Sequence, residues 1–195
     1  MKMQVTETHR VVGKLFEHCS STYRHSQRVG DLLYQFANYL KLKDTEQIFL
    51  LGIIHDIGKL NIPKSLLNKK GPLTQEEFNK IKLHTKYGQE IVKNIKGLPA
   101  EYSSIVRFHH ENWDGSGYYG LQGINDGIPL LSRMIRIVDS YDAMIHGRIY
   151  QEGKTQYEAI REICSFSGKY YDPDLTIEFK DFLNKIYYLN HKTGS

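Results

Sequence analysis

Cysteine is scarce in this chain. Its 195 residues include two cysteines, Cys19 and Cys164, which lie far apart and have no metal-binding spacing. A disulfide framework and a cysteine-rich zinc site are therefore excluded. Two isolated thiols suit a reducing compartment.

Long apolar runs are also missing. The longest, IFLLGII at 48–54, is much shorter than the ~20 residues that span a bilayer. The first ten residues, MKMQVTETHR, are polar and lack the apolar segment of a secretory signal. We therefore expect a cytoplasmic protein with no membrane insertion.

The chain has no repeat, no low-complexity linker and no strong excess of charge. Its formal net charge is +4, from 26 Lys and Arg against 22 Asp and Glu. This excess is too small to indicate DNA binding, but it is compatible with a small anionic ligand. A length of 195 residues suits one domain, and 40% hydrophobic residues are enough to form its core. We therefore expect one domain over residues 1–195, in which an N-terminal helix over 1–19 precedes the core motifs.

Alternating strand patterns are absent, and helical periodicity covers most of the chain. The pattern predicts helices over residues 8–19, 21–40, 44–58, 74–95, 99–110, 129–145, 155–166 and 172–189. Thr74 with Glu77 and Thr155 with Glu158 have the spacing of capping boxes. Asp44 is expected to cap the third helix, and Pro99 to lie in the first turn of the fifth. The sequence therefore predicts an all-α bundle.

Several histidines and aspartates fall on apolar helix faces or at helix ends. His55 follows Ile48 by seven residues and Leu51 by four, so it shares their face. Burying such groups without partners costs about 2–7 kcal/mol each, so they must pair with other side chains or bind metal ions. The set is His25, His55, Asp56, His84, His109, His110 and Asp139. The remaining histidines, His9, His18, His146 and His191, are interpreted as ordinary core, capping or surface residues.

The size of this set favours metal binding. Five imidazoles and two carboxylates are too many for one ion, but they suit two ions that share a carboxylate. Mixed nitrogen and oxygen ligands favour divalent transition metals, with iron or manganese expected first and zinc, cobalt or nickel as alternatives. A hydroxide bridging two ions about 3.5–4 Å apart can attack phosphorus in line. We therefore expect an anionic ligand such as a phosphodiester.

Six sequence blocks point to a family. In order they are HSQRV, GIIHDIGKLNIP, KKGPLTQEEFNKIKLHTKYG, HHENWDGSGYYGLQG, RMIRIVDSYDAM and GRIY. Together, from about Ser20 to about Pro173, they resemble the HD-GYP subgroup of the HD phosphohydrolases. The resemblance implies an HD-domain helical bundle with additional C-terminal helices. It also implies a metal-dependent phosphodiesterase that hydrolyses cyclic di-GMP or a related cyclic dinucleotide.

The resemblance also implies roles for individual residues. One ion would be held by His25, His55, Asp56 and Asp139, and the other by Asp56, which bridges, with His84, His109 and His110. Lys59 would meet the scissile phosphate or protonate the leaving oxygen. Asp142 would orient Lys59 or a ligand, and Arg148 would contact a phosphate of the substrate. The ring of Tyr118 would offer a stacking face for a base.

Three departures from the family pattern stand out. The signature loop reads Gly117-Tyr118-Tyr119 where the family has a final proline, and the last block reads Arg148-Ile149-Tyr150 where it also has a proline. Because Tyr119 does not fix φ, we expect a less rigid loop. Some members bind a third ion through an acid where this chain has Ser21, so we expect two ions.

Two other functions remain open on the sequence. The absence of proline at positions 119 and 149 suits a regulatory module. Such a module would hydrolyse its substrate poorly and would bind a nucleotide or a diguanylate cyclase partner. A phosphohydrolase acting on other nucleotides is the second alternative, although no nucleoside or triphosphate pocket is evident in the sequence.

Overall fold

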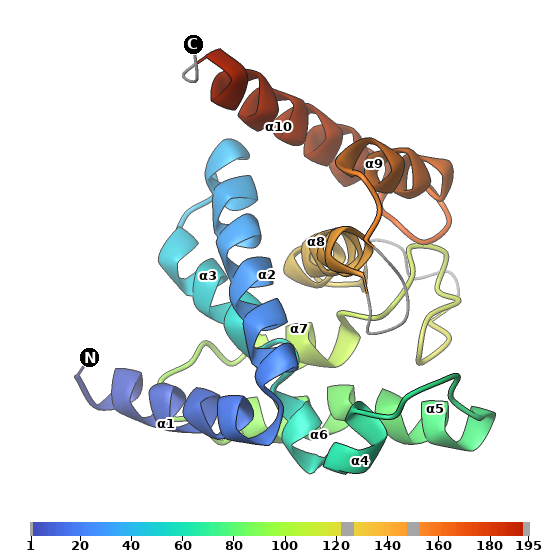
Figure 1. Ribbon diagram of the computed structural model, residues 1–195. Helices are drawn as coiled ribbons and strands as arrows, with labels where there is room; N and C mark the ends of the chain where they lie inside the picture. Colours follow the sequence, from blue (N-terminus) through green and yellow to red (C-terminus); the bar gives the residue numbers. More distant parts are fainter. Residues whose placement is uncertain (1, 122–126, 148–152, 193–195) are drawn as a thin grey trace.

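The computed structural model describes residues 2–121, 127–147 and 153–192, and these are arranged as a bundle of helices (Figure 1). Its elements are α1 (Lys2–His18), α2 (Ser20–Tyr39), α3 (Thr45–Ile54), the 3-10 helix η1 (Ile57–Asn61), α4 (Lys64–Leu67), α5 (Gln75–Lys82), α6 (His84–Lys93), α7 (Tyr102–Phe108), α8 (Leu130–His146), α9 (Gln156–Ser165) and α10 (Pro173–Lys192). The described residues form no strand, which confirms the all-α prediction. None of the described helices is both long enough and apolar enough to span a membrane.

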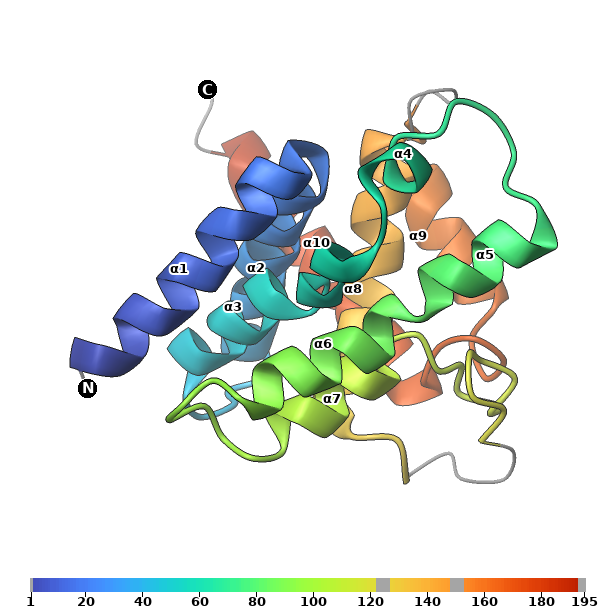
Figure 2. The ribbon, with the colours of Figure 1, turned by 90° about the horizontal axis from the view of Figure 1, so that it is seen from below.

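Helix α2 is central to the packing. It contacts α1, α3, α8 and α10, and Figure 1 shows it beside α3 and between α1 and α10. Its buried face carries Val29, Leu33 and Phe36, and the ring of Phe36 lies 5.1 Å from that of Phe179 in α10. The C-terminal helices therefore close one side of the core. The other side is covered by the lower layer of Figure 1, which includes α5, α6 and α7 and which Figure 2 shows from below.

Two close backbone contacts determine how the helices meet. A Cβ atom on Gly52 would lie 2.6 Å from Cα of Gly30, so α2 and α3 can touch only because both positions are glycine. A Cβ atom on Gly58 would lie 1.8 Å from the carbonyl oxygen of His84. The η1 segment is thus held directly against the start of α6, which brings Asp56 close to His84.

The predicted helix over 44–58 is shorter in the structure. Helix α3 ends at Ile54, and a separate 3-10 turn begins at Ile57. His55 and Asp56 therefore lie at a joint between two elements. The expected side-chain cap by Asp44 is wrong, because this residue has a left-handed backbone with φ of 55° and makes no capping hydrogen bond. An N-cap side chain normally reaches the first turn from an extended backbone.

The predicted helix over 74–95 is interrupted. Helix α5 begins with the predicted capping box, in which Thr74 Oγ1 accepts from the backbone of Glu77. The second box, at Thr155, is also confirmed. Leu83 then separates α5 from α6, so that His84 begins a new helix. Pro99 precedes α7 by three residues instead of lying in its first turn, so that prediction was wrong.

Candidate metal centre

Helix ends and the interiors of two helices bring the seven predicted ligands together. His25 comes from α2, His55 and Asp56 from the joint after α3, His84 from the start of α6, His109 and His110 from the end of α7, and Asp139 from α8. They form two groups, one of Asp56, His84, His109 and His110, and the other of His25, His55 and Asp139. Within each group the potential ligand atoms lie within 4.8 Å of one another. This division matches the implied ligand sets, with Asp56 between them.

Asp56 faces both groups. Its Oδ1 lies 3.2 Å from Nε2 of His84, and its Oδ2 lies 3.6 Å from Nε2 of His55. The Asp56 side chain is only 2% exposed, so water screens this carboxylate poorly. One carboxylate with an oxygen toward each group has the geometry needed to bridge two ions.

The hydrogen bonds of three histidines define which nitrogen is available. In His55, His84 and His109, Nδ1 lies 2.6–2.7 Å from the backbone carbonyl three residues earlier. A carbonyl oxygen only accepts, so Nδ1 carries the proton and Nε2 of the neutral ring has a free lone pair. Nε2 of His55 is buried and has no hydrogen-bond partner among the described residues. Such an orphaned acceptor, facing carboxylate oxygens, fits a metal ligand.

Burial keeps several of these imidazoles neutral. Burial, reinforced by the neighbouring His55 and His84, lowers the pKa of His109 to about 3. Burial also lowers the pKa of His55, and burial with the neighbouring His109 lowers the pKa of His110 well below its usual value. Neutral imidazoles are the form that binds metal ions, so the protonation states suit the proposed chemistry.

Both ring nitrogens of His25 contact carboxylates, unlike those of the other histidines described above. Its Nε2 lies 2.8 Å from Oδ1 of Asp139, and its Nδ1 lies 2.7 Å from Oδ2 of Asp142. Burial alone would lower the pKa of His25, but the two hydrogen bonds outweigh burial and raise the pKa to about 9. Without a metal ion, His25 is therefore an imidazolium that supplies positive charge between two carboxylates.

Lys59 supplies the second positive charge. Its Nζ donates to Oδ2 of Asp56 at 2.5 Å. Burial would raise the pKa of Asp56, but the Lys59 ammonium, with help from His55 and His84, holds that pKa well below its usual value. The family resemblance implies that Lys59 would meet the scissile phosphate or protonate the leaving oxygen, whereas the structure places its ammonium against a predicted metal ligand.

Asp142 contacts a predicted ligand, and none of the described contacts joins it to Lys59. Its carboxylate accepts from Nε and Nη2 of Arg28 at 2.8 and 2.9 Å, in addition to the bond with His25. His146, interpreted from the sequence as ordinary, lies 3.0 Å from Oδ1 of Asp142. Sequence reasoning missed Arg28, although it follows His25 by three residues and so shares its helix face.

The glycine loop after α7 is held by contacts of Tyr119. The backbone N–H of Tyr119 donates to Oε1 of Glu111 at 2.6 Å. The Tyr119 ring lies 4.2 Å from the guanidinium carbon of Arg107, and its hydroxyl lies 2.5 Å from Oγ1 of Thr85. These contacts act against the expected loosening, because the N–H that proline lacks is used as a donor. Sequence reasoning missed Glu111, which is only 2% exposed.

The centre opens to solvent on one side. The side chains of His25, Lys59, His110 and Asp139 are 13–22% exposed, whereas those of the other four residues are at most 2% exposed. A ligand that reaches the centre would therefore approach beside these four groups. Tyr118 lies at this edge, with its ring 4.7 Å from that of His110. Arg148, with Ile149 and Tyr150, lies outside the described residues.

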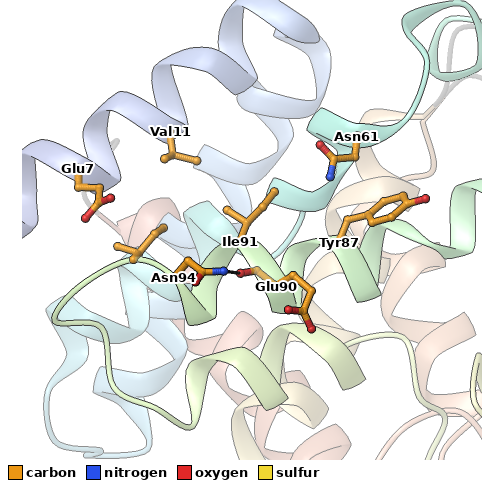
Figure 3. Close-up of a pocket in the computed structure, with 8 residues that line it drawn as sticks. Glu7, Val11, Asn61, Tyr87, Glu90, Ile91 and Asn94 are labelled. Atoms are coloured by element: carbon orange, nitrogen blue, oxygen red, sulfur yellow. Dashed lines mark hydrogen bonds between the residues drawn. The ribbon is translucent and has the colours of Figure 1, made fainter.

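A separate groove of about 330 Å³ lies between α1, η1 and α6 (Figure 3). It is lined by Glu7, Val11, Asn61, Tyr87, Glu90, Ile91, Asn94 and Ile95. It contains none of the predicted site residues, and its two glutamates disfavour an anionic ligand. The groove is therefore not a candidate for binding a phosphodiester.

Comparison with known proteins shows the family to which the chain belongs. The family model described as HD domain matches residues 13–175. A cyclic di-GMP phosphodiesterase of Thermotoga maritima is 40% identical over 81% of this chain and 44% of the relative. The cyclic di-GMP phosphodiesterase PA4108 of Pseudomonas aeruginosa is 35% identical over 85% of this chain and 39% of the relative. The chain thus spans less than half the length of these relatives.

The fold also matches a solved structure. The HD domain of phosphodiesterase PgpH from L. monocytogenes has a TM-score of 0.68 and 22% identity, covering 92% of this chain and 99% of that domain. The same domain has been solved in complex with cyclic di-AMP. The chain belongs to the HD-domain family. The resemblance of its motif blocks to the HD-GYP subgroup is likewise confirmed by its relatives.

Proposed function

We propose that this chain is a metal-dependent phosphodiesterase that hydrolyses cyclic di-GMP or a related cyclic dinucleotide. The observation that carries the proposal is the position of Asp56, with one oxygen toward each of two nitrogen-rich ligand groups. The activity named for the similar bacterial proteins supports the same substrate class. A cytoplasmic location is part of the proposal, because the thiols of Cys19 and Cys164 are both free.

The proposed cofactor is a pair of divalent transition-metal ions. The two sets of residues that would hold them are His25, His55, Asp56 and Asp139, and Asp56, His84, His109 and His110. Iron or manganese is the first choice, with zinc, cobalt or nickel as alternatives, because the ligands mix imidazole and carboxylate. When bound, such ions lower the pKa of water and neutralise charge that develops on a phosphate.

Lys59 is the proposed catalytic side chain that can change partner. In the structure its ammonium neutralises Asp56, a task that a bound cation would take over. Lys59, whose side chain is 22% exposed, would then be free to pair with a phosphate oxygen or to protonate the leaving oxygen. Asp142 would act indirectly, since it holds Nδ1 of His25 and so fixes the direction of Nε2. Tyr118 and Arg148 remain the proposed contacts to a base and a phosphate of the substrate.

Turnover of cyclic di-GMP by protein loaded with iron or manganese tests the proposal. The matched variant is Asp56→Asn, which keeps the shape of the side chain and removes the bridging charge. We expect hydrolysis by the parent protein and none above background by the variant. Lack of hydrolysis of any cyclic dinucleotide by fully loaded protein would overturn the proposal.

The same assay separates the two alternatives. Tight binding of cyclic di-GMP or of a diguanylate cyclase domain without turnover would indicate a regulatory module. Hydrolysis of nucleoside mono- or triphosphates in place of cyclic dinucleotides would indicate another phosphohydrolase. The contacts of Tyr119 argue against a loosened signature loop, which was the sequence feature that suited a regulatory role.

A further inference from the structure

A corner of two aromatic rings lies next to the candidate metal centre. Phe78, in α5, and Tyr118, in the glycine loop, meet edge to face with ring centroids 6.0 Å apart and planes at 86°. Figure 1 shows this loop above α5, although 40 residues separate the two rings in the sequence. Phe78 is 37% exposed, so part of its ring remains available for a ligand.

A lysine lies in the same corner. Nζ of Lys82, one helical turn after Phe78, is 5.0 Å from the centroid of each ring. This ammonium makes no hydrogen bond or ion pair with a side chain in the part of the chain that the structure describes. The ammonium lies over two ring faces, and it acts to lower the pKa of the nearby Glu111 carboxylate without forming an ion pair with it. An anion can therefore still approach this charge.

The corner adjoins the open edge of the centre. The ring of Tyr118 lies 4.7 Å from that of His110 and 6.3 Å from that of His84, both predicted metal ligands. A ligand held on Phe78 would therefore extend from the centre across Tyr118. The spacing suits the part of a substrate next to its reacting phosphate.

We infer that Phe78 and Lys82 form, with Tyr118, a subsite that binds one purine base of the substrate and the phosphate beside it. The inference rests on the proposed function, to which it adds two recognition residues from α5. An aromatic face stacks on any base, and an adjacent ammonium attracts the phosphate. A purine nucleotide unit combines both features, whereas a simple phosphodiester offers only the charge.

Binding of a fluorescent probe tests this subsite without relying on turnover. The probe is a cyclic dinucleotide in which 2-aminopurine replaces one guanine, because stacking on an aromatic ring quenches its fluorescence. With manganese-loaded full chain, we expect quenching by the parent protein. Phe78→Ala should lose most of the quenching and weaken binding about tenfold, as expected for one lost stack. Lys82→Gln should weaken binding while the bound probe remains quenched.

Two matched controls are available in this chain. Phe16 is also exposed and meets Tyr23 edge to face at 5.3 Å, so Phe16→Ala should leave probe binding unchanged. Lys80, also in α5, pairs with Glu76, and Lys80→Gln should likewise have no effect. Hydrolysis of methyl p-nitrophenyl phosphate, which has no base, should fall less in Phe78→Ala than hydrolysis of the cyclic dinucleotide.

The outcomes separate this inference from the proposed function. Equal quenching by the parent protein and Phe78→Ala would overturn the subsite, as would a parent protein that does not bind the probe. An equal loss of activity on both substrates in Phe78→Ala would also overturn it, because that pattern indicates a structural role. A parent protein that binds and quenches the probe but hydrolyses no cyclic dinucleotide would contradict only the proposed function.

Discussion

Tyr119 and Glu111 are joined by a hydrogen bond of 2.6 Å from the backbone N–H of Tyr119 to Oε1 of Glu111. Burial raises the pKa of Glu111, and the backbone N–H of Tyr119 acts in the opposite direction by stabilising the carboxylate. Because Glu111 directly follows the two candidate ligands at 109 and 110, this bond links the signature loop to the metal centre. The family's proline at position 119 would lack this donor.

Tyr119→Pro should therefore destabilise this chain. Proline gains about 0.4–1 kcal/mol by restricting the unfolded chain. The buried Glu111 carboxylate would lose one of the backbone N–H groups that stabilise it, which costs about 1–3 kcal/mol, so the loss outweighs the gain. Urea unfolding should show a lower free energy of unfolding. Tyr119→Phe keeps the N–H and loses only the hydroxyl contact with Thr85, so it should cost less. A Tyr119→Pro protein more stable than the parent would contradict this account.

The two ligand groups predict two metal ions per chain. Protein purified without chelators should contain about two equivalents by elemental analysis, because Ser21 supplies no acid for a third. His84→Ala removes a ligand from the group that contains His109 and His110, and it should retain about one equivalent. A reproducible content of one or three ions in the parent protein would contradict the prediction.

Gly58→Ala should disrupt the centre without touching a ligand. The added Cβ would lie 1.8 Å from the carbonyl oxygen of His84 and 2.3 Å from the nitrogen of Gly88, so α6 must move away. We expect a loss of about 1–3 kcal/mol in the free energy of unfolding together with a lower metal content.

The control is Gly13→Ala in α1, where an added Cβ meets nothing within 4 Å. Replacing a helical glycine there should stabilise the protein by up to about 1 kcal/mol and leave metal content unchanged. If Gly58→Ala unfolds like the parent protein and binds two ions, the close contact between η1 and α6 has no energetic importance.

The pH dependence of the metal-free protein follows from His25. Its pKa is raised from 6.5 to about 9, so its contribution to stability is complete below about pH 6.5 and disappears as pH rises through 9. Thermal melts in the presence of a chelator should therefore show a melting temperature that falls between pH 7 and 9. His25→Gln should remove this slope, and a slope that persists in the variant would assign it to another group.

Metal binding should change in the opposite direction over the same range. Nε2 of His25 must lose its proton before it can hold an ion, so affinity should rise with pH up to about 9. Calorimetry in buffers of different ionisation enthalpy should detect the released proton at pH 7.5. Binding with no proton release at that pH would show that His25 is already neutral.

The sequence alone determined the helical class and indicated the candidate site residues. Periodicity indicated where most of the helices lie, although not all of their bounds. The capping boxes at Thr74 and Thr155 correctly indicated where two helices begin, because capping is a local effect of residue spacing. The seven candidate ligands were also evident from the sequence, since polar groups on apolar faces need partners. Their joint presence in two compact groups agrees with that reasoning.

Only the tertiary structure decided how these groups are shared and held. Asp56 divides its oxygens between two groups because η1 meets α6 at Gly58, a contact that no local pattern encodes. Asp142 bonds His25 across 117 residues of chain. The pairing of Phe78 with Tyr118 is likewise nonlocal. Periodicity reports which face of a helix is buried, but the partner that covers that face depends on packing of the whole chain.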